Sequence, residues 1–322
     1  MTRTFERSRE LLSTLWRASA PLTAAAVVLL GLLGVSLAGL LLDPRVITGA
    51  PAWLKPAKFA ISTAVYSLTV AWFFTFLPDW PRLRRFAGTA TAAVFLLEVV
   101  LIDMQAWRGM TSHFNVGTIL DAVVFGIMGT AIAFQTLVGV AVAAALWRQP
   151  FADRAMGWAM RLGLTLSLIG ATVGGIMTRP TDAQLDAARA TGRIAVSGAH
   201  TVGAPDGGPG LIGTGWSREH GDLRVPHFVG LHAMQALPLL AVILRRRRVA
   251  GLTATRLVIT GGISYGLLFV VLLWQALRGQ SLVTPDSVTV VALSVWLALT
   301  VTTAWVAATW HRRSLHSHAL VY

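Results

Sequence analysis

Eight apolar runs, each long enough to cross a bilayer as a helix, restrict the folds that this sequence can adopt. A transmembrane helix needs about 20 mostly apolar residues, and it satisfies its backbone hydrogen bonds internally, as lipid requires. The chain is therefore predicted to be all-α: a polytopic membrane helical bundle of about eight transmembrane helices, with residues 1–322 forming a single transmembrane domain. The predicted spans are about 22–42, 58–77, 86–102, 118–146, 156–177, 227–244, 253–276 and 288–310.

The composition supports this class and excludes several kinds of cofactor site. Charged residues make up 13% of the chain, whereas soluble proteins have about 25%. The chain has no cysteine, which excludes disulfide exchange, iron–sulfur clusters, thiolate metal sites and cysteine-attached haem. Ser36-Leu37-Ala38 resembles a signal-peptidase site, but the apolar run of about 21 residues exceeds a usual signal-peptide core, so we expect the first span to be retained.

The charges of the loops between the predicted spans indicate the orientation of the chain. One side holds 17 Lys and Arg with four acids, including the run Arg245–Arg248, and the other side holds ten of each. The whole formal charge of +13 therefore lies on one side, which the positive-inside rule assigns to the cytoplasm. We expect both termini to be cytoplasmic, in a multi-pass protein of the plasma (inner) membrane. Because the basic segments are short juxtamembrane loops, the expected partner is the lipid bilayer, and no nucleic acid is expected.

The longest loop, residues 178–225, is predicted to be extracytoplasmic. A short helix is expected near its start, at 182–189, and the stretch GAPDGGPGLIGTGW follows at 203–216. Such a Gly-rich stretch favours turns over helix. Because the loop is too small to bury a core of its own, we expect it to cover the bundle.

Polar side chains gather at the extracytoplasmic ends of the spans, and two of them are the only lysines. The chain has 25 Arg but only Lys55 and Lys58 as lysines, and both stand at a helix N-terminus, where the macrodipole disfavours cations. They are predicted either to pair with a helix acid or to bind an anion such as phosphate, carboxylate or a haem propionate. Arg108 is a third candidate for such cofactor binding.

Acids and histidines on the same side are the candidate catalytic and metal-binding groups. Glu98 lies inside the third span, where an acid is costly, so it is either a partnered structural residue or a catalytic one. His113, Asp121, His227 and His232 are candidate metal ligands, with His232 also a candidate catalytic residue. His227 and His232 lie five residues apart, about 140° around a helix, so any partner of His232 must come from elsewhere.

Two further features are expected to serve helix packing. Gln135, near the middle of the fourth span, is predicted to make an interhelical hydrogen bond. The small residues of Gly170-Ala171-Thr172-Val173-Gly174 are predicted to allow close approach of two helices.

Three functional hypotheses follow from these residues. The first is a membrane oxidoreductase or hydrolase with one extracytoplasmic site, dependent on a divalent metal or on haem b. The second is a metal-free hydrolase or transferase acting on lipid headgroups, for which Ser112, Ser217, His113 and His232 are available. The third is a transporter or a small-ligand sensor. In each case an anionic small molecule or a lipid headgroup is the expected ligand.

Overall fold

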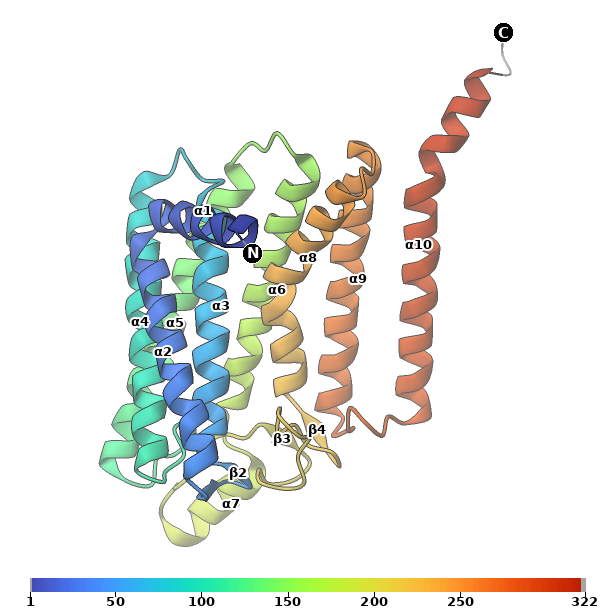
Figure 1. Cartoon of the computed structure of the whole chain (residues 1–322). Coiled ribbons are helices and arrows are strands. Elements are labelled where there is room, and N and C mark those ends of the chain that lie inside the picture. The colour runs from blue at the N-terminus through green and yellow to red at the C-terminus, as the bar shows by residue number, and fades with distance from the viewer. Residues whose placement is uncertain (1, 320–322) are drawn as a thin grey trace. The chain divides into compact units, whose positions relative to one another are not determined.

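The chain is an all-α polytopic helical bundle with eight helices long and apolar enough to span a membrane within its described part, as predicted (Figure 1). A computed structural model describes residues 2–319, and it describes the side chains of residues 9–309. An even number of candidate spans agrees with the expectation that both termini lie on one side of the membrane. The spans are α2 (Ala20–Leu42), α3 (Leu54–Phe74), α4 (Pro81–Trp107), α5 (Ile119–Arg148), α6 (Arg154–Met177), α8 (Arg224–Arg246), α9 (Gly251–Leu277) and α10 (Ser287–Ala319).

The remaining elements are short. The expected helix of the long loop is α7 (Asp182–Thr191), which begins with a capping box between Thr181 and Gln184. Helix α1 (Thr2–Ala18) was not predicted, because its polar residues keep it below the hydropathy of a span. It lies across the N-terminal end of α2 and the C-terminal end of α3 (Figure 1). Two antiparallel hairpins pair β1 (Val46–Ile47) with β2 (Ala50–Pro51) and β3 (Thr201–Val202) with β4 (Gly221–Asp222).

The helices fall into two compact units, which are described separately. The first unit comprises Met1–Ala145, Gly175–His200 and Pro205–Gly215. The second unit comprises Leu146–Gly174, Thr201–Ala204 and Trp216–Tyr322. Segments of the 178–225 loop belong to both units.

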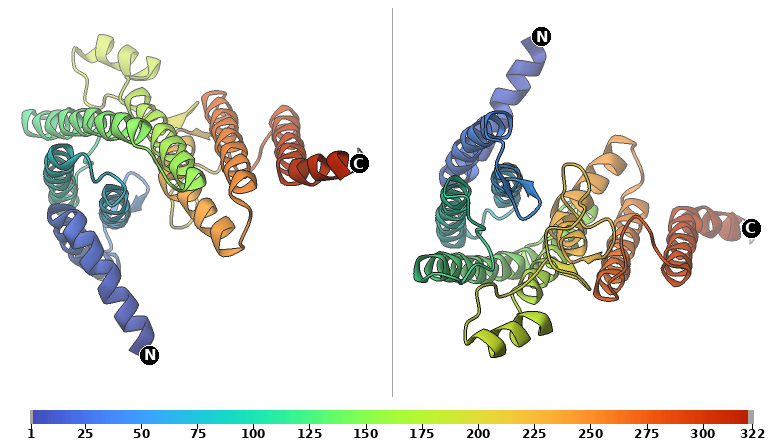
Figure 2. Two further views of the ribbon diagram at one scale, coloured as in Figure 1. Left: turned by 90° about the horizontal axis from the view of Figure 1, so that it is seen from above. Right: turned by 90° about the horizontal axis from the view of Figure 1, so that it is seen from below.

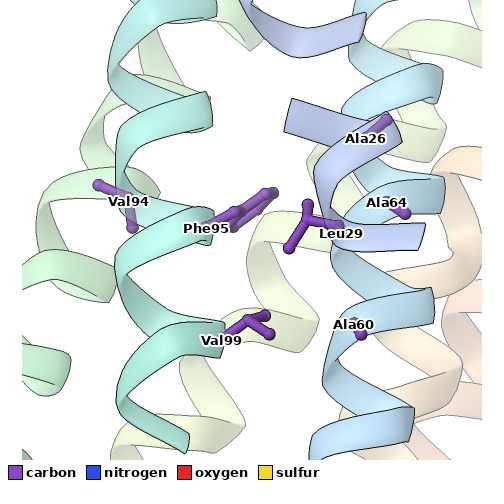
Figure 3. Close-up of a cluster of buried hydrophobic side chains, with 7 residues drawn as sticks. All are labelled: Ala26, Leu29, Ala60, Ala64, Val94, Phe95 and Val99. Atoms are coloured by element: carbon purple, nitrogen blue, oxygen red, sulfur yellow. The ribbon is translucent and has the colours of Figure 1, made fainter. Parts of the chain in front are cut away.

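The core of the first unit lies where α2, α3 and α4 meet. Small residues on α2 and α3 let the helices approach closely, and larger side chains of α4 fill the space between them. Phe95 points toward Leu29 of α2, whereas its neighbour Val94 points to the opposite side of α4 (Figure 3). The buried cluster consists of Ala26, Leu29, Ala60, Ala64, Val94, Phe95 and Val99.

Helix α5 carries a buried polar side chain near its middle. Gln135 is 7% exposed, and its Oε1 has no hydrogen-bond partner among the described residues. The interhelical hydrogen bond expected for Gln135 stays a prediction.

An ion pair at the outer end of α2 positions the start of α3. Asp43 accepts hydrogen bonds from the Arg45 guanidinium, at 2.6 Å for the Nη2 donor, and from the Trp53 indole nitrogen at 2.8 Å. Arg45 also donates to the carbonyl of Trp107 at 2.9 Å, which joins the outer ends of α2 and α4. These hydrogen bonds, first those from Arg45 and then that from Trp53, hold the pKa of Asp43 well below its usual range. We call the contacts of Asp43 with Arg45 and Trp53 the Asp43 clamp. Because Trp53 directly precedes α3, the clamp positions the first turn of α3, which carries both lysines.

In the second unit, α6 and α8 cross at two glycines. A Cβ added to Gly170 would lie 2.5 Å from the Cα of Gly230, so the backbones are in direct contact. The packing role predicted for the Gly170–Gly174 pattern is confirmed at Gly170. Helix α9 is tied to α8 by the Tyr265 hydroxyl, which donates to the carbonyl of Val229 at 2.6 Å.

The close contact at the glycine crossing predicts that a side chain added at Gly170 lowers the stability of the protein. Gly170→Ala should lower the thermal unfolding midpoint in detergent, because overpacking costs about 1–3 kcal/mol and exceeds the helix-propensity gain of about 0.5–1 kcal/mol. Gly175→Ala is the matched control on the same helix, since an added Cβ there meets no atom within 4 Å. Equal midpoints for the two variants would contradict this account of the crossing.

The Asp43 clamp predicts a pH-dependent contribution to stability. Because its folded-state pKa is lowered from 3.8, its contribution is present at neutral pH and is lost as pH falls through the folded-state pKa. The unfolding midpoint of Asp43→Asn should therefore lie below that of the wild type at pH 7, and the difference should narrow below about pH 4. A difference that does not change between pH 7 and pH 3 would show that the carboxylate charge is not what the clamp uses.

Candidate functional site

Three of the predicted polar residues meet at the outer end of the first unit. Lys55 comes from the first turn of α3, Glu98 from the outer half of α4, and His113 from the loop between α4 and α5. His113 Nε2 lies 3.7 Å from Glu98 Oε1. Lys55 acts electrostatically on the same carboxyl group, and its ammonium lies 5.8 Å from the centre of the Phe59 ring. The structure thus brings together a base, an acid and a cation from three separate segments.

Glu98 is the deepest polar group of this cluster. It stands nine residues before the end of α4, so its Cα is about 13 Å along the helix from that end. Its side chain is 1% exposed, and its Oε2 has no hydrogen-bond partner among the described residues. Burial of a carboxyl group in an apolar span is costly, so such a group usually faces a polar partner.

Ser112 adds a hydroxyl group to the cluster. Its Oγ lies 3.1 Å from His113 Nδ1, on the side of the imidazole ring opposite the Glu98 carboxyl group. Both ring nitrogens of His113 therefore face a polar partner. A hydroxyl, a base and a third group that orients the base form the arrangement used in nucleophilic catalysis. We call these three residues the Ser–His–Glu group.

Aromatic rings enclose the imidazole of His113. The ring centres of Phe59, Phe114 and Phe125 lie 5.6, 6.1 and 6.3 Å from that of His113. Phe114 has a φ of 65°, a strained left-handed conformation for a non-glycine residue. Its carbonyl accepts a hydrogen bond from the Ser197 amide at 2.8 Å, so the long loop helps to hold this conformation. The rings give the Ser–His–Glu group an apolar surrounding.

The long loop contributes a second imidazole–carboxylate pair, which was not predicted. His200 Nδ1 lies 2.6 Å from Asp206 Oδ2, and the His200 ring contacts Phe114 at a centre distance of 4.8 Å. Lys58 donates to the carbonyl of Thr214 at 2.8 Å, which ties α3 to the same loop. The high Gly content indicates turns but does not reveal which side chains those turns bring together.

Asp121 and Arg108 lie together in a clamp between α4 and α5. Asp121 Oδ1 accepts from Arg108 at 2.8 Å and from Gln105 at 2.9 Å, and its Oδ2 accepts from Thr118 at 2.6 Å. Arg108 also donates to Gln105. Since both carboxylate oxygens of Asp121 accept hydrogen bonds, this geometry favours a structural role for Asp121 over the predicted metal ligation.

His227 and His232 belong to the second unit and have partners there. His227 Nδ1 lies 2.9 Å from the carbonyl of Gly170, next to the glycine crossing. His232 Nδ1 lies 3.3 Å from Gln235 Oε1, and its ring contacts that of Phe228 at 4.2 Å between centres. These contacts are consistent with helix packing for His227 and with a shared face for His232 and Gln235.

The geometry gives the metal hypothesis no support. Within the described part of the chain, no three His, Asp or Glu side chains gather closely enough to hold a metal ion. The metal role predicted for His113, Asp121, His227 and His232, and the cofactor-binding role predicted for Lys55, Lys58 and Arg108, stay predictions.

Comparison of the chain with protein-family models, curated proteins and solved structures found no match. The chemistry of the side chains is therefore the basis for any functional assignment.

The clamp around Asp121 predicts a structural effect that can be separated from catalysis. Asp121→Asn should lower the thermal unfolding midpoint, because the Asn amide would face the donors of Arg108 and Gln105. Asp103→Asn is the control. Asp103 lies near the end of α4 that carries Gln105 and Arg108, and its Oδ1 is buried without a hydrogen-bond partner among the described residues. That second substitution should leave the midpoint unchanged or raise it, and a larger loss there than at Asp121 would contradict the clamp.

Proposed function

We propose that the protein is a metal-free hydrolase or transferase that cleaves an ester at the extracytoplasmic surface of the membrane. The observation that carries the proposal is the Ser–His–Glu group, with Ser112 Oγ and Glu98 Oε1 on opposite sides of one imidazole. The second of the sequence-based hypotheses is therefore preferred to the first. The positive-inside count supports an extracytoplasmic position for this group, and the plasma (inner) membrane is the proposed location.

The proposed reaction uses each member of the group at a stated atom. His113 Nδ1 takes the proton of Ser112 as its Oγ attacks the ester carbonyl carbon. Glu98 orients Nε2 and stabilises the imidazolium that results. The tetrahedral intermediate collapses, the C–O bond to the leaving alkoxide breaks, and His113 returns the proton to that alkoxide. A water or an acceptor alcohol then releases the acyl group from Ser112 by the same proton transfers.

The cations and the apolar surrounding support the same chemistry. Lys55 and Lys58 provide positive charge at the N-terminal turn of α3 for an anionic group of the substrate. The rings of Phe59, Phe114 and Phe125 lower the local dielectric, which strengthens the interaction between imidazolium and carboxylate.

The other hypotheses each require a further condition. A divalent metal would need ligands beyond the Ser–His–Glu group, and haem b would need two axial histidines at one iron. A transporter or sensor would need a polar path or a ligand-dependent change. The metal-dependent, haem-dependent and transporter or sensor hypotheses remain the alternatives, and the activity assays must distinguish the ester chemistry from them.

The test is hydrolysis of para-nitrophenyl butyrate by purified protein in detergent, with and without EDTA. Ser112→Ala and His113→Asn should each reduce kcat/KM by at least about 10³-fold, and Glu98→Gln should reduce it by about 10²-fold. Ser197→Ala is the matched control: Ser197 is a partly exposed serine of the same unit, and its hydroxyl makes only a 3.5 Å contact. A fluorophosphonate probe should label Ser112 in the wild type.

Two outcomes would overturn the proposal. One is wild-type protein that neither hydrolyses the ester nor reacts with the fluorophosphonate. The other is activity that survives Ser112→Ala but is lost with EDTA and restored by zinc, which would favour the metal-dependent alternative.

A further inference from the structure

An apolar groove runs along the lipid-facing side of the first unit between α4 and α5. It is shallow and open to the surrounding medium over most of its extent, with a volume of about 590 Å³. The Thr130 hydroxyl donates to the carbonyl of Gly126 at 2.9 Å, so it is satisfied within α5. The lining residues of this α4–α5 groove are Val94, Val123, Gly126, Ile127, Thr130, Ala131 and Phe134.

Helix direction and residue size create the groove. In both end-on views, α4 is seen nearly along its axis while α5 extends sideways, so the two helices are inclined to each other (Figure 2). Gly126 contributes no side chain, and a Cβ added there would meet no atom within 4 Å. Val94, a member of the buried cluster, points to the other side of α4 from Leu29 (Figure 3). The groove therefore borders the core cluster on the α5 side of α4.

The two ends of the groove differ in chemistry. At the inner end, Phe134 contacts Phe86 of α4 edge to face, with 6.3 Å between ring centres. At the outer end, Glu98 follows Val94 by four residues on α4 and so shares its face. Phe125 of α5, near that end, contacts the His113 ring. Phe134 thus lines one end of the groove, and the other end lies one helical turn from residues that contact the Ser–His–Glu group.

The length of the groove matches one leaflet of a bilayer. From Val123 to Phe134 the α5 backbone rises by about 16 Å, and half of the hydrocarbon core is about 15 Å thick. The exposed side chains of Val123, Ile127 and Phe134 lie within a span, so the surrounding medium is lipid. An extended acyl chain is the ligand that fits an apolar groove open to lipid over that depth.

The geometry points to a phospholipid acyl chain as the occupant of the α4–α5 groove, and to an anionic phospholipid as the substrate class. This inference rests on the proposed ester chemistry of Ser112. The chain would lie against α5 with its ester at the outer end, near His113 and Glu98. Lys55 and Lys58 complement a phosphate-bearing headgroup at the same end.

The binding test uses phosphatidylglycerol with a diazirine on its acyl chain, in vesicles that contain the purified protein. Photolysis should label peptides of α4 and α5 from the wild type. Gly126→Leu should reduce that labelling several-fold, because the new side chain extends into the groove from a position where an added Cβ meets no atom within 4 Å. Gly129→Leu is the matched control, since an added Cβ there also meets no atom within 4 Å and Gly129 does not line the groove.

A kinetic test separates this inference from the proposed function. Gly126→Leu should reduce turnover of phosphatidylglycerol while leaving para-nitrophenyl acetate hydrolysis unchanged, and Ser112→Ala should abolish both. If the wild type hydrolyses the acetate but α4 and α5 are not labelled, the groove inference is overturned and the ester chemistry stands. If both helices are labelled and Gly126→Leu prevents it, while neither ester is hydrolysed, the groove binds lipid and the enzyme proposal fails.

Discussion

A carboxyl group buried inside a membrane span must face a compensating group, and the outer end of the first unit is arranged around that requirement. Glu98 lies on a helix face that otherwise packs against apolar side chains, and lipid provides no hydrogen-bond donor at that depth. The polar groups that face it come from outside the helix, His113 from a loop and Lys55 from α3. The position of α3 depends in turn on the Asp43 clamp, so the site and the fold share one set of polar contacts.

The loop that carries His113 is held by interactions of several kinds. The Asp121 clamp fixes where α5 begins, the strained φ of Phe114 turns the chain, and the Ser197 amide pairs with the Phe114 carbonyl. Strain at a residue next to a candidate base is tolerated because the surrounding contacts determine the backbone there.

The sequence predicts the spans well and the site only in part, for a physical reason. The bilayer requires apolar runs of a minimum length, and cytoplasmic loops carry an excess of Lys and Arg. Both features are visible in the sequence without knowledge of tertiary contacts. The gathering of Lys55, Glu98 and His113 depends on loop turns, as does the His200–Asp206 pair, and hydropathy carries no information on these. His227 illustrates the limit most clearly, because its partner is a backbone carbonyl, an acceptor present at every position.

Access to the Ser–His–Glu group follows from how the first unit is closed on its aqueous side. The amide of Val116 donates to the carbonyl of Ala195, and Lys58 donates to that of Thr214, so the long loop is tied to both the α4–α5 connection and α3. These ties restrict approach from water at that end of the unit. Between α4 and α5 the helices are inclined and Gly126 leaves room, so a ligand already dissolved in the bilayer meets the fewest obstacles. If the α4–α5 groove serves the site as proposed, the tied aqueous face would make the site select ligands that partition into the membrane, whatever chemistry it then performs.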